Sequence, residues 1–115
     1  MNTSDVYTLA LAAYAHSLHD VTSSKRAHIM AELEDRAVVE VDIKFWTSEL
    51  IEASETHYGA NNARSIDIET TAYALLAYTA PGAENAIENG LPMVFWLSRQ
   101  RNPAGGFSST QVSNI

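Results

Sequence analysis

The feature that most constrains the fold of this chain is a pair of apolar segments that share a short core and lie about 60 residues apart. The sequence AAYAHSL at 12–18 and the sequence TAYALLA at 71–77 both contain Ala-Tyr-Ala. Each belongs to a longer stretch, 5–20 or 67–80, that is apolar around most of a helical circumference. A helix without a polar face is usually buried on several sides. The repeat therefore predicts two buried helices in equivalent units, with Asp5 or Ser4 as N-cap of the first and Asp67 opening the second.

An amphipathic segment follows each of these helices. The segment 23–41 has apolar residues at three- and four-residue steps, which predicts one helix over the whole range. A second amphipathic helix is predicted over 91–101, because Pro92 suits a first helical turn and Pro103 disfavours helical angles at the residue before it. The stretch 83–90 is compatible with a short helix or a loop. Each unit is thus an antiparallel hairpin of one buried and one half-exposed helix.

Stacking such hairpins in a ring places the apolar helices inside and the amphipathic helices outside. We therefore predict an all-α fold, an α/α toroid of stacked helical hairpins, present here as an incomplete ring. The hairpins span about 5–46 and 67–107 in one domain, 1–115, followed by the truncated start of a third hairpin. In this arrangement the aromatic pair Phe45-Trp46 of the first unit corresponds to Phe107 of the second.

The last segment, GGFSSTQVSNI, supports this reading of the second unit. Gly105 and Gly106 can adopt positive φ, so the chain can reverse tightly and turn Phe107 back as a plug. The alternative is that GGF is an ordinary loop in which Phe107 has no packing role. Ser108 and Gln111 form the S-x-x-Q pattern of a capping box, which introduces a helix, yet four residues remain after it. We therefore expect the sequence to be a piece of a longer protein.

Composition and charge exclude several function classes. The formal net charge is −7, which argues against nucleic acid and anionic membranes as partners. The chain contains no cysteine, so it cannot itself hold a disulfide, a thiolate zinc site, a cysteine nucleophile or a thioester. No signal peptide is visible, and no stretch is apolar for long enough to insert into a bilayer.

Two groups of residues are candidate sites of chemistry. His16 and His19 have i, i+3 spacing with Asp20 beside them, which could hold a metal ion. A third ligand at a convincing position is missing, and histidine is favourable at a helix C-terminus in any case, so no metal site is predicted. Asp67 and Glu69 are carboxylates in a first helical turn, where the helix dipole favours them, and a catalytic pair is the weaker interpretation.

The remaining candidates favour packing. Thr70 and Thr71 could act as nucleophiles only beside a base, and none is evident. Tyr73 and Tyr78 are predicted core residues whose hydroxyl groups reach the rim of the ring, and Trp96 is predicted to pack. The residues by themselves thus predict a helical packing module with no catalytic residue, no metal and no cofactor.

Three stretches resemble one family, the thioester domain of the alpha-2-macroglobulins, complement component three and the insect thioester-containing proteins. IETTAYALLA resembles its E-x-T-[SA]-Y-A-L-L-A helix, VFWLSRQRNPAGGFSSTQ resembles its V-x-W-L-x-x-Q-R and G-G-[FY]-x-S-T-Q stretch, and VYTLALAAYA is similar to an earlier helix. The residues taken as the structural family motif are Glu69, Tyr73, Trp96, Gln100, Gly105, Gly106, Phe107, Thr110 and Gln111.

The resemblance implies an α/α toroid that, in the family, carries a cysteine–glutamine thioester in a G-C-G-E-Q motif. Proteolysis of the parent protein exposes the thioester, which acylates a nearby amine or hydroxyl, assisted by a histidine in complement-type members. Neither the cysteine nor the motif is present in this chain. Its histidines, His16, His19, His28 and His57, do not match the assisting histidine, so no catalytic role is transferred to them.

The first hypothesis is therefore a fragment of an extracellular alpha-macroglobulin or thioester-containing protein that traps proteases or opsonises targets. The piece acts as scaffold, and its partners are other domains of the parent and, through the parent, proteases or target surfaces. The second is a free-standing helical protein-interaction module without thioester chemistry. A third, an enzyme of the terpene-cyclase or prenyltransferase type, lacks the aspartate-rich motif or zinc triad that it would need. The first hypothesis predicts that the isolated chain is molten, aggregated or dimeric, because its inner helices lack lateral neighbours.

Overall fold

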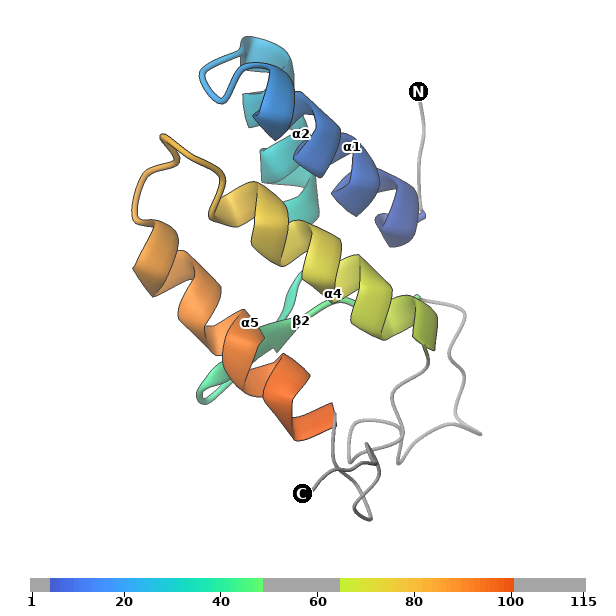
Figure 1. Ribbon diagram of the computed structural model, residues 1–115. Coiled ribbons are helices and arrows are strands. Elements are labelled where there is room, and N and C mark those ends of the chain that lie inside the picture. Colours follow the sequence, from blue (N-terminus) through green and yellow to red (C-terminus); the bar gives the residue numbers. More distant parts are fainter. Residues whose placement is uncertain (1–4, 49–64, 101–115) are drawn as a thin grey trace, which may run out of the picture.

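The computed structural model describes residues 5–48 and 65–100, and these are mostly helical (Figure 1). The elements in chain order are α1 (Val6–His19), α2 (Ser24–Asp35), β1 (Val38–Glu40), β2 (Ile43–Phe45), α4 (Ser65–Tyr78) and α5 (Ala86–Gln100). The two strands pair antiparallel as a short hairpin. The predicted all-α class is confirmed. None of the helices within residues 5–48 and 65–100 combines the length and the apolar composition that a membrane-spanning helix needs.

Side-chain caps define where the first two helices begin. The carboxylate of Asp5 accepts hydrogen bonds from the backbone N–H of Tyr7 at 3.0 Å and from the hydroxyl of Thr8 at 2.7 Å. Ser23 caps α2 in the same way, because its hydroxyl accepts the backbone N–H of Arg26 at 3.0 Å. Each cap satisfies a donor that the first turn of a helix leaves without an intrahelical partner. Of the two N-caps considered for the first helix, Asp5 is the one observed.

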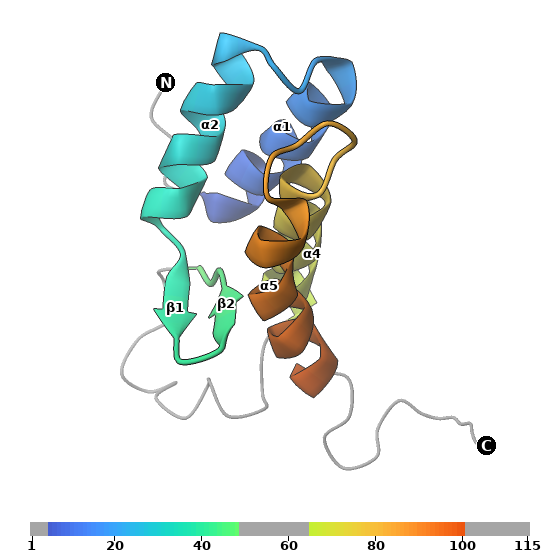
Figure 2. The ribbon, with the colours of Figure 1, turned by 90° about the vertical axis from the view of Figure 1, so that its left-hand side faces the viewer.

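The predicted apolar helices form the centre of the structure. α1 and α4 lie side by side and run in the same direction, with α2 against α1 and α5 against α4 (Figures 1 and 2). Two alanines on each central helix are fully buried: Ala10, Ala13, Ala74 and Ala77. Their small side chains allow the helix axes to approach closely, since interaxial distance follows the size of the residues at the contact.

One hydrophobic core connects the central helices with the rest. Its buried members are Val6, Leu9, Ala10, Ala13, Leu33, Trp46, Ala74, Ala77, Tyr78 and Met93. Leu33 comes from α2, Met93 from α5, and Trp46 from the segment that follows β2. Burying side chains of this size contributes about 1.5–3 kcal/mol each for the larger aliphatic and aromatic groups. The core therefore depends on the outer elements as well as on α1 and α4.

The prediction of one helix over 23–41 is wrong in its last third. The helix ends at Asp35, and the chain continues into β1, where Val38 pairs with Phe45 and Glu40 pairs with Ile43. The valines of this stretch are β-branched and favour extended backbone. Pairing in a hairpin also carries the chain to Trp46, which is fully buried. Tertiary burial of that ring outweighs the helical spacing that the sequence shows.

The prediction for the last helix is also corrected. α5 begins at Ala86, so most of the stretch 83–90 is helical, and Pro92 lies inside the helix instead of in its first turn. The loop before it turns through Gly82, whose φ is +90°, a conformation that glycine adopts without strain. Gly90 then lets α5 approach α4, because a Cβ at this position would lie 2.9 Å from the Cγ2 of Thr79.

Two parts of the fold prediction stay predictions. The helix pairs α1–α2 and α4–α5 lie close to the predicted hairpins 5–46 and 67–107, although α4 begins two residues earlier, at Ser65. Whether these pairs belong to a toroid depends on helices on either side of them and stays a prediction. The predicted glycine–aromatic corner and capping box, 105–111, lie outside the described residues.

Candidate functional site

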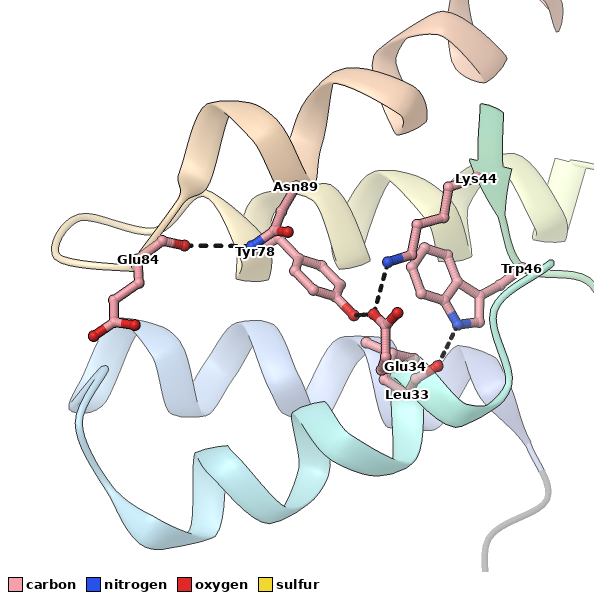
Figure 3. Close-up of polar contacts among 7 residues, drawn as sticks. All are labelled: Leu33, Glu34, Lys44, Trp46, Tyr78, Glu84 and Asn89. Carbon is pink, nitrogen blue, oxygen red and sulfur yellow. Dashed lines mark hydrogen bonds and ion pairs between the residues drawn. The ribbon is translucent and has the colours of Figure 1, made fainter. Parts of the chain in front are cut away.

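A polar cluster joins α2, β2 and α4 where the three elements meet (Figure 3). The carboxylate of Glu34 accepts a hydrogen bond from the ammonium group of Lys44 at 2.6 Å and another from the hydroxyl of Tyr78. The Lys44 ammonium also lies 5.0 Å from the centre of the Tyr78 ring. Beside it, the indole N–H of Trp46 donates to the backbone carbonyl of Leu33 at 2.8 Å. These contacts fix the β-hairpin against the helices.

Burial and hydrogen bonding set the charges in this cluster. Partial burial by itself raises the pKa of Glu34, but the hydrogen bonds from Lys44 and Tyr78 outweigh it and leave the pKa lowered. Burial, followed by the hydrogen bond to Glu34 and its negative charge, raises the pKa of Tyr78 well above its ordinary value. At neutral pH the carboxylate of Glu34 is therefore ionised and the phenol of Tyr78 stays a hydrogen-bond donor.

Arg26 connects three helices at the C-terminal end of α4, the same end that carries Tyr78. Its Nε donates to the hydroxyl of Ser17 on α1 at 2.6 Å, and its Nη2 donates to the carbonyl of Ala77 on α4 at 2.8 Å. A third contact, at 3.4 Å, reaches the carbonyl of Val21. A cation that donates to a carbonyl in the last turn of a helix is favourable because the helix dipole places negative charge there. Arg26 thus holds the α1–α2 turn to the end of α4.

Asp67 is a buried connector and does not open its helix. α4 begins at Ser65, and the side chain of Asp67 is 1% exposed. Its carboxylate accepts hydrogen bonds from the hydroxyl of Thr47 at 2.9 Å and the backbone N–H of Ser48 at 3.2 Å. Burial raises the pKa of Asp67, and the two hydrogen bonds oppose that effect without cancelling it. The carboxylate ties the segment after β2 to α4.

The hydroxyl groups weighed as nucleophiles have structural partners. The hydroxyl of Thr70 donates to the carbonyl of Ile66 on its own helix at 2.7 Å. The hydroxyl of Thr71 accepts the backbone N–H of Trp46 at 3.1 Å. The side chain of Glu69, which the sequence paired with Asp67, is exposed to solvent. These residues therefore do not converge on one point, as a catalytic group would require.

The aromatic residues singled out from sequence lie at helix contacts. The Tyr73 ring is half-buried between Tyr7 and Tyr14, with ring centroids 6.0 Å and 5.9 Å away. Trp96 is buried and stacks on Phe45 with a centroid separation of 4.8 Å and an interplanar angle of 4°. Such aromatic pairs stabilise a contact by about 0.5–1.5 kcal/mol beyond the area that they bury.

The other motif residues divide between the described and the undescribed parts. The amide of Gln100 donates to the carbonyl of Trp96 in the last turn of α5 at 3.0 Å. The motif residues beyond it, Gly105, Gly106, Phe107, Thr110 and Gln111, lie outside the described ranges. His16 is half-buried and His19 is exposed at the end of α1. Across residues 5–48 and 65–100, no group of three or more His, Cys, Asp or Glu side chains could hold a metal ion.

Comparison with known proteins decides the family. A family model described as the A-macroglobulin TED domain matches residues 1–114. Ovostatin of Gallus gallus is 34% identical over 113 residues, which cover 96% of this chain and 8% of ovostatin. The chain belongs to the A-macroglobulin TED domain family.

Membership of this TED family confirms the resemblance that the sequence motifs indicated. It covers nearly the whole chain, including the segments that the structure does not describe. Because the chain spans 8% of the length of ovostatin, what a whole protein of this kind does is not carried over to the chain as a fact.

Sequence reasoning about this TED segment missed its polar connectors. Arg26 and Glu34 occupy ordinary positions on an amphipathic helix, where charged residues usually face solvent. Lys44 and Tyr78, the two partners of Glu34, become neighbours only because the β-hairpin forms. The sequence instead predicts that the helix continues to residue 41. A faint signal existed in Lys44, a cation set between Ile43 and the aromatic pair after it in a segment otherwise suited to burial.

Proposed function

We propose that this chain is the helical scaffold of a thioester domain in a longer, extracellular alpha-macroglobulin-type protein, and that it supplies no catalytic group of its own. The match to the A-macroglobulin TED domain over residues 1–114 carries the proposal. The structure supports the proposal, because buried titratable residues such as Tyr78 and Asp67 have structural partners. Their side chains hydrogen-bond to neighbouring elements and hold them together.

The parent protein, in this proposal, carries the thioester elsewhere in its sequence. Its cleavage by a protease exposes the thioester, an amine or hydroxyl of the target attacks the acyl carbon, and the cysteine sulfur leaves as a thiol. The parent thereby traps proteases or marks target surfaces, and this segment meets other domains of the parent. The absence of cysteine from the chain means that the reacting sulfur must come from outside residues 1–115.

Methylamine tests the proposal on the parent protein. Antibodies raised against this chain are used to purify the parent protein from the extracellular fluid that contains it. Isotopically labelled methylamine is then added, and the protein is digested and analysed by mass spectrometry. We expect label in a peptide outside residues 1–115, with release of one thiol for each amide formed. A parent that incorporates no methylamine and releases no thiol would contradict the proposal.

The alternative, a free-standing interaction module, makes a different prediction for the isolated chain. A scaffold segment keeps exposed apolar side chains that other parts of its domain would cover, among them Leu11, Leu18 and Leu76. We expect such a chain to associate or to unfold over a broad temperature range. A strictly monomeric chain with a sharp, reversible thermal transition, measured by sedimentation and calorimetry, would favour the module.

A further inference from the structure

A groove runs between the β-hairpin and α5, on the outer side of the structure where Figure 2 shows the two side by side. Its volume is about 560 Å³. Apolar side chains from both elements line it, with Val39 and Ile43 on the hairpin and Leu91 and Phe95 on α5. Leu91 is 45% exposed although it is a large aliphatic residue. The groove is therefore an apolar surface open to solvent.

The apolar surface continues along α5. Leu91 follows Ile87 by four residues, and Val94 and Phe95 follow Leu91 by three and four, so the four residues form a stripe on one face of the helix, and all four are exposed. A second hollow of about 240 Å³ lies beside the stripe, between α5 and Leu75 of α4, and Leu91 lines it as well. A contiguous exposed stripe of this kind is typical of an interaction site.

The groove carries negative charge. Four carboxylates line it, namely Glu34, Glu40, Asp42 and Glu88. Two of them already have cations, since Glu34 pairs with Lys44 and Asp42 pairs with Arg99 at 2.9 Å. Glu40 and Glu88 form no ion pair with any other described residue. An occupant with positive charge at two places would therefore be complementary to the groove.

The backbone of α5 adds a further acceptor at the same place. Pro92 lies inside the helix and has no N–H, so it cannot donate to the carbonyl of Glu88 one turn before it. Glu88 thus offers a carboxylate and a carbonyl without that intrahelical donor, both beside the groove. A lysine or arginine side chain of an occupant can donate to both.

We propose that this groove docks a basic amphipathic helix of another domain of the parent protein. Its apolar face packs on Leu91, Phe95 and Val39, and its lysine or arginine side chains lie against Glu40 and Glu88. Anionic membrane is disfavoured as occupant, because the same carboxylates repel it. The proposal rests on the scaffold role proposed above and names the surface through which that role is exerted.

A designed peptide tests the proposal with the full chain. The probe is a Leu/Lys amphipathic helix of about 14 residues, roughly four turns, with one leucine replaced by photo-leucine and a fluorophore at one end. The matched control replaces each lysine with glutamate. We expect the Leu/Lys peptide to bind saturably and to crosslink to 38–45 and 86–95. Equal binding of the Leu/Glu peptide, no binding, or crosslinks spread over α1 and α2 would each overturn the proposal.

Matched variants of the chain show whether the peptide binds at the groove or is held only by the net negative charge of the chain. Leu91→Asp removes the centre of the apolar stripe, and we expect it to weaken binding about tenfold or more. The double variant Glu40→Lys, Glu88→Lys should weaken it by about tenfold as well, with a flatter salt dependence. The controls are Leu18→Asp and the double variant Asp35→Lys, Glu84→Lys, which change exposed residues outside the groove lining and should bind within about twofold of the original chain.

The variant results distinguish the remaining outcomes. If the control and groove variants lose binding equally, the peptide is held by net charge and the proposal is wrong. If the chain associates with itself through 38–45 and 86–95 and thereby excludes the peptide, a second copy is the occupant and the proposal is again wrong. Neither result bears on methylamine labelling of the parent, so failure here is distinguishable from failure of the proposed function.

Discussion

The inner pair of helices and the outer elements of this structure are held together by different kinds of interaction. α1 and α4 meet through fully buried alanines and a row of tyrosine rings, so their contact depends on small size and close approach. The outer elements, α2, the β-hairpin and α5, each bury fewer residues, and they are held by a few large buried side chains together with polar connectors such as Arg26 and the Glu34–Lys44 pair.

The difference would let one segment serve both of the roles proposed for it, as a scaffold and as a docking surface. The inner contact tolerates little change in volume, because a close-packed interface has no room for added methylene groups. The outer elements are positioned by a few large buried side chains and a few hydrogen bonds, and this leaves other apolar side chains of α5, such as Leu91, exposed for another contact. Variants that alter one region and spare the other test this separation.

The largest effect is expected where the two regions meet, at Trp46. Its ring is fully buried, and its indole N–H donates to the carbonyl of Leu33. Trp46→Ala should lower the free energy of unfolding by about 3–5 kcal/mol, because it leaves a cavity in the shared core. Urea unfolding followed by the fluorescence of Trp96 measures it. A loss below about 1 kcal/mol would show that the outer elements do not share the core.

Overpacking tests the inner contact. Ala13→Leu adds volume where α1 is fully buried, and we expect a loss of about 1–3 kcal/mol in unfolding free energy. Ala27→Leu is the matched control, because Ala27 is exposed on α2 and the same change there should be nearly neutral. Equal effects of the two substitutions in urea unfolding would remove the distinction between the inner and outer helices.

The polar connector on the outer side should respond unequally to loss of its two members. The Lys44 side chain is 11% exposed and that of Glu34 is 54% exposed. Glu34→Gln leaves a nearly buried ammonium without its ion pair and should cost about 2 kcal/mol, whereas Lys44→Met leaves a carboxylate that water can solvate and should cost about 1 kcal/mol. The same urea experiment compares them. The reverse order would mean that Lys44 reaches solvent.

The smallest effect is a pH dependence with opposite signs at two carboxylates. The pKa of Glu34 is lowered from its ordinary 4.5, so its ionised form adds stability above that value, and this contribution is lost as the pH falls through the lowered pKa. The pKa of Asp67 is raised from its ordinary 3.8, so the folded state binds its proton more tightly, and protonation of this group stabilises the fold.

Two variants isolate these contributions. Glu34→Gln should make stability fall less between about pH 7 and about pH 3.5, and Asp67→Asn should make it fall more. Urea midpoints at the two pH values, compared with those of the original chain, give the change. If both variants changed the pH dependence in the same direction, one of the two assignments would be wrong.

The same division sets how much the sequence could predict. The inner helices follow from apolar composition on all faces, the shared Ala-Tyr-Ala core and the Asp5 cap, which are local signals, and the family follows from motifs around Tyr73 and Trp96. The β-hairpin did not follow, because Ala37 and Val41 continue the helical spacing of the residues before them, and only the burial of Trp46 breaks that pattern.

The outer connectors could not be predicted for a related reason. Glu34, Lys44 and Tyr78 come from three elements, and no spacing along the chain relates them until the hairpin is in place. The start of α5 was misplaced because Pro92 is more common in a first turn than inside a helix. The groove beside α5 depends on both of these features and thus could not be inferred from the sequence.

The packing of α1 directly against α4 is the central claim, and proton–proton contacts between tyrosine rings test it most directly. In a chain with protonated tyrosine rings and all other side chains deuterated, nuclear Overhauser cross-peaks are measured and assigned with Tyr→Phe variants. We predict cross-peaks from the Tyr73 ring to both Tyr7 and Tyr14, whose centroids lie 6.0 Å and 5.9 Å away. A folded chain in which Tyr73 shows neither cross-peak would contradict the account.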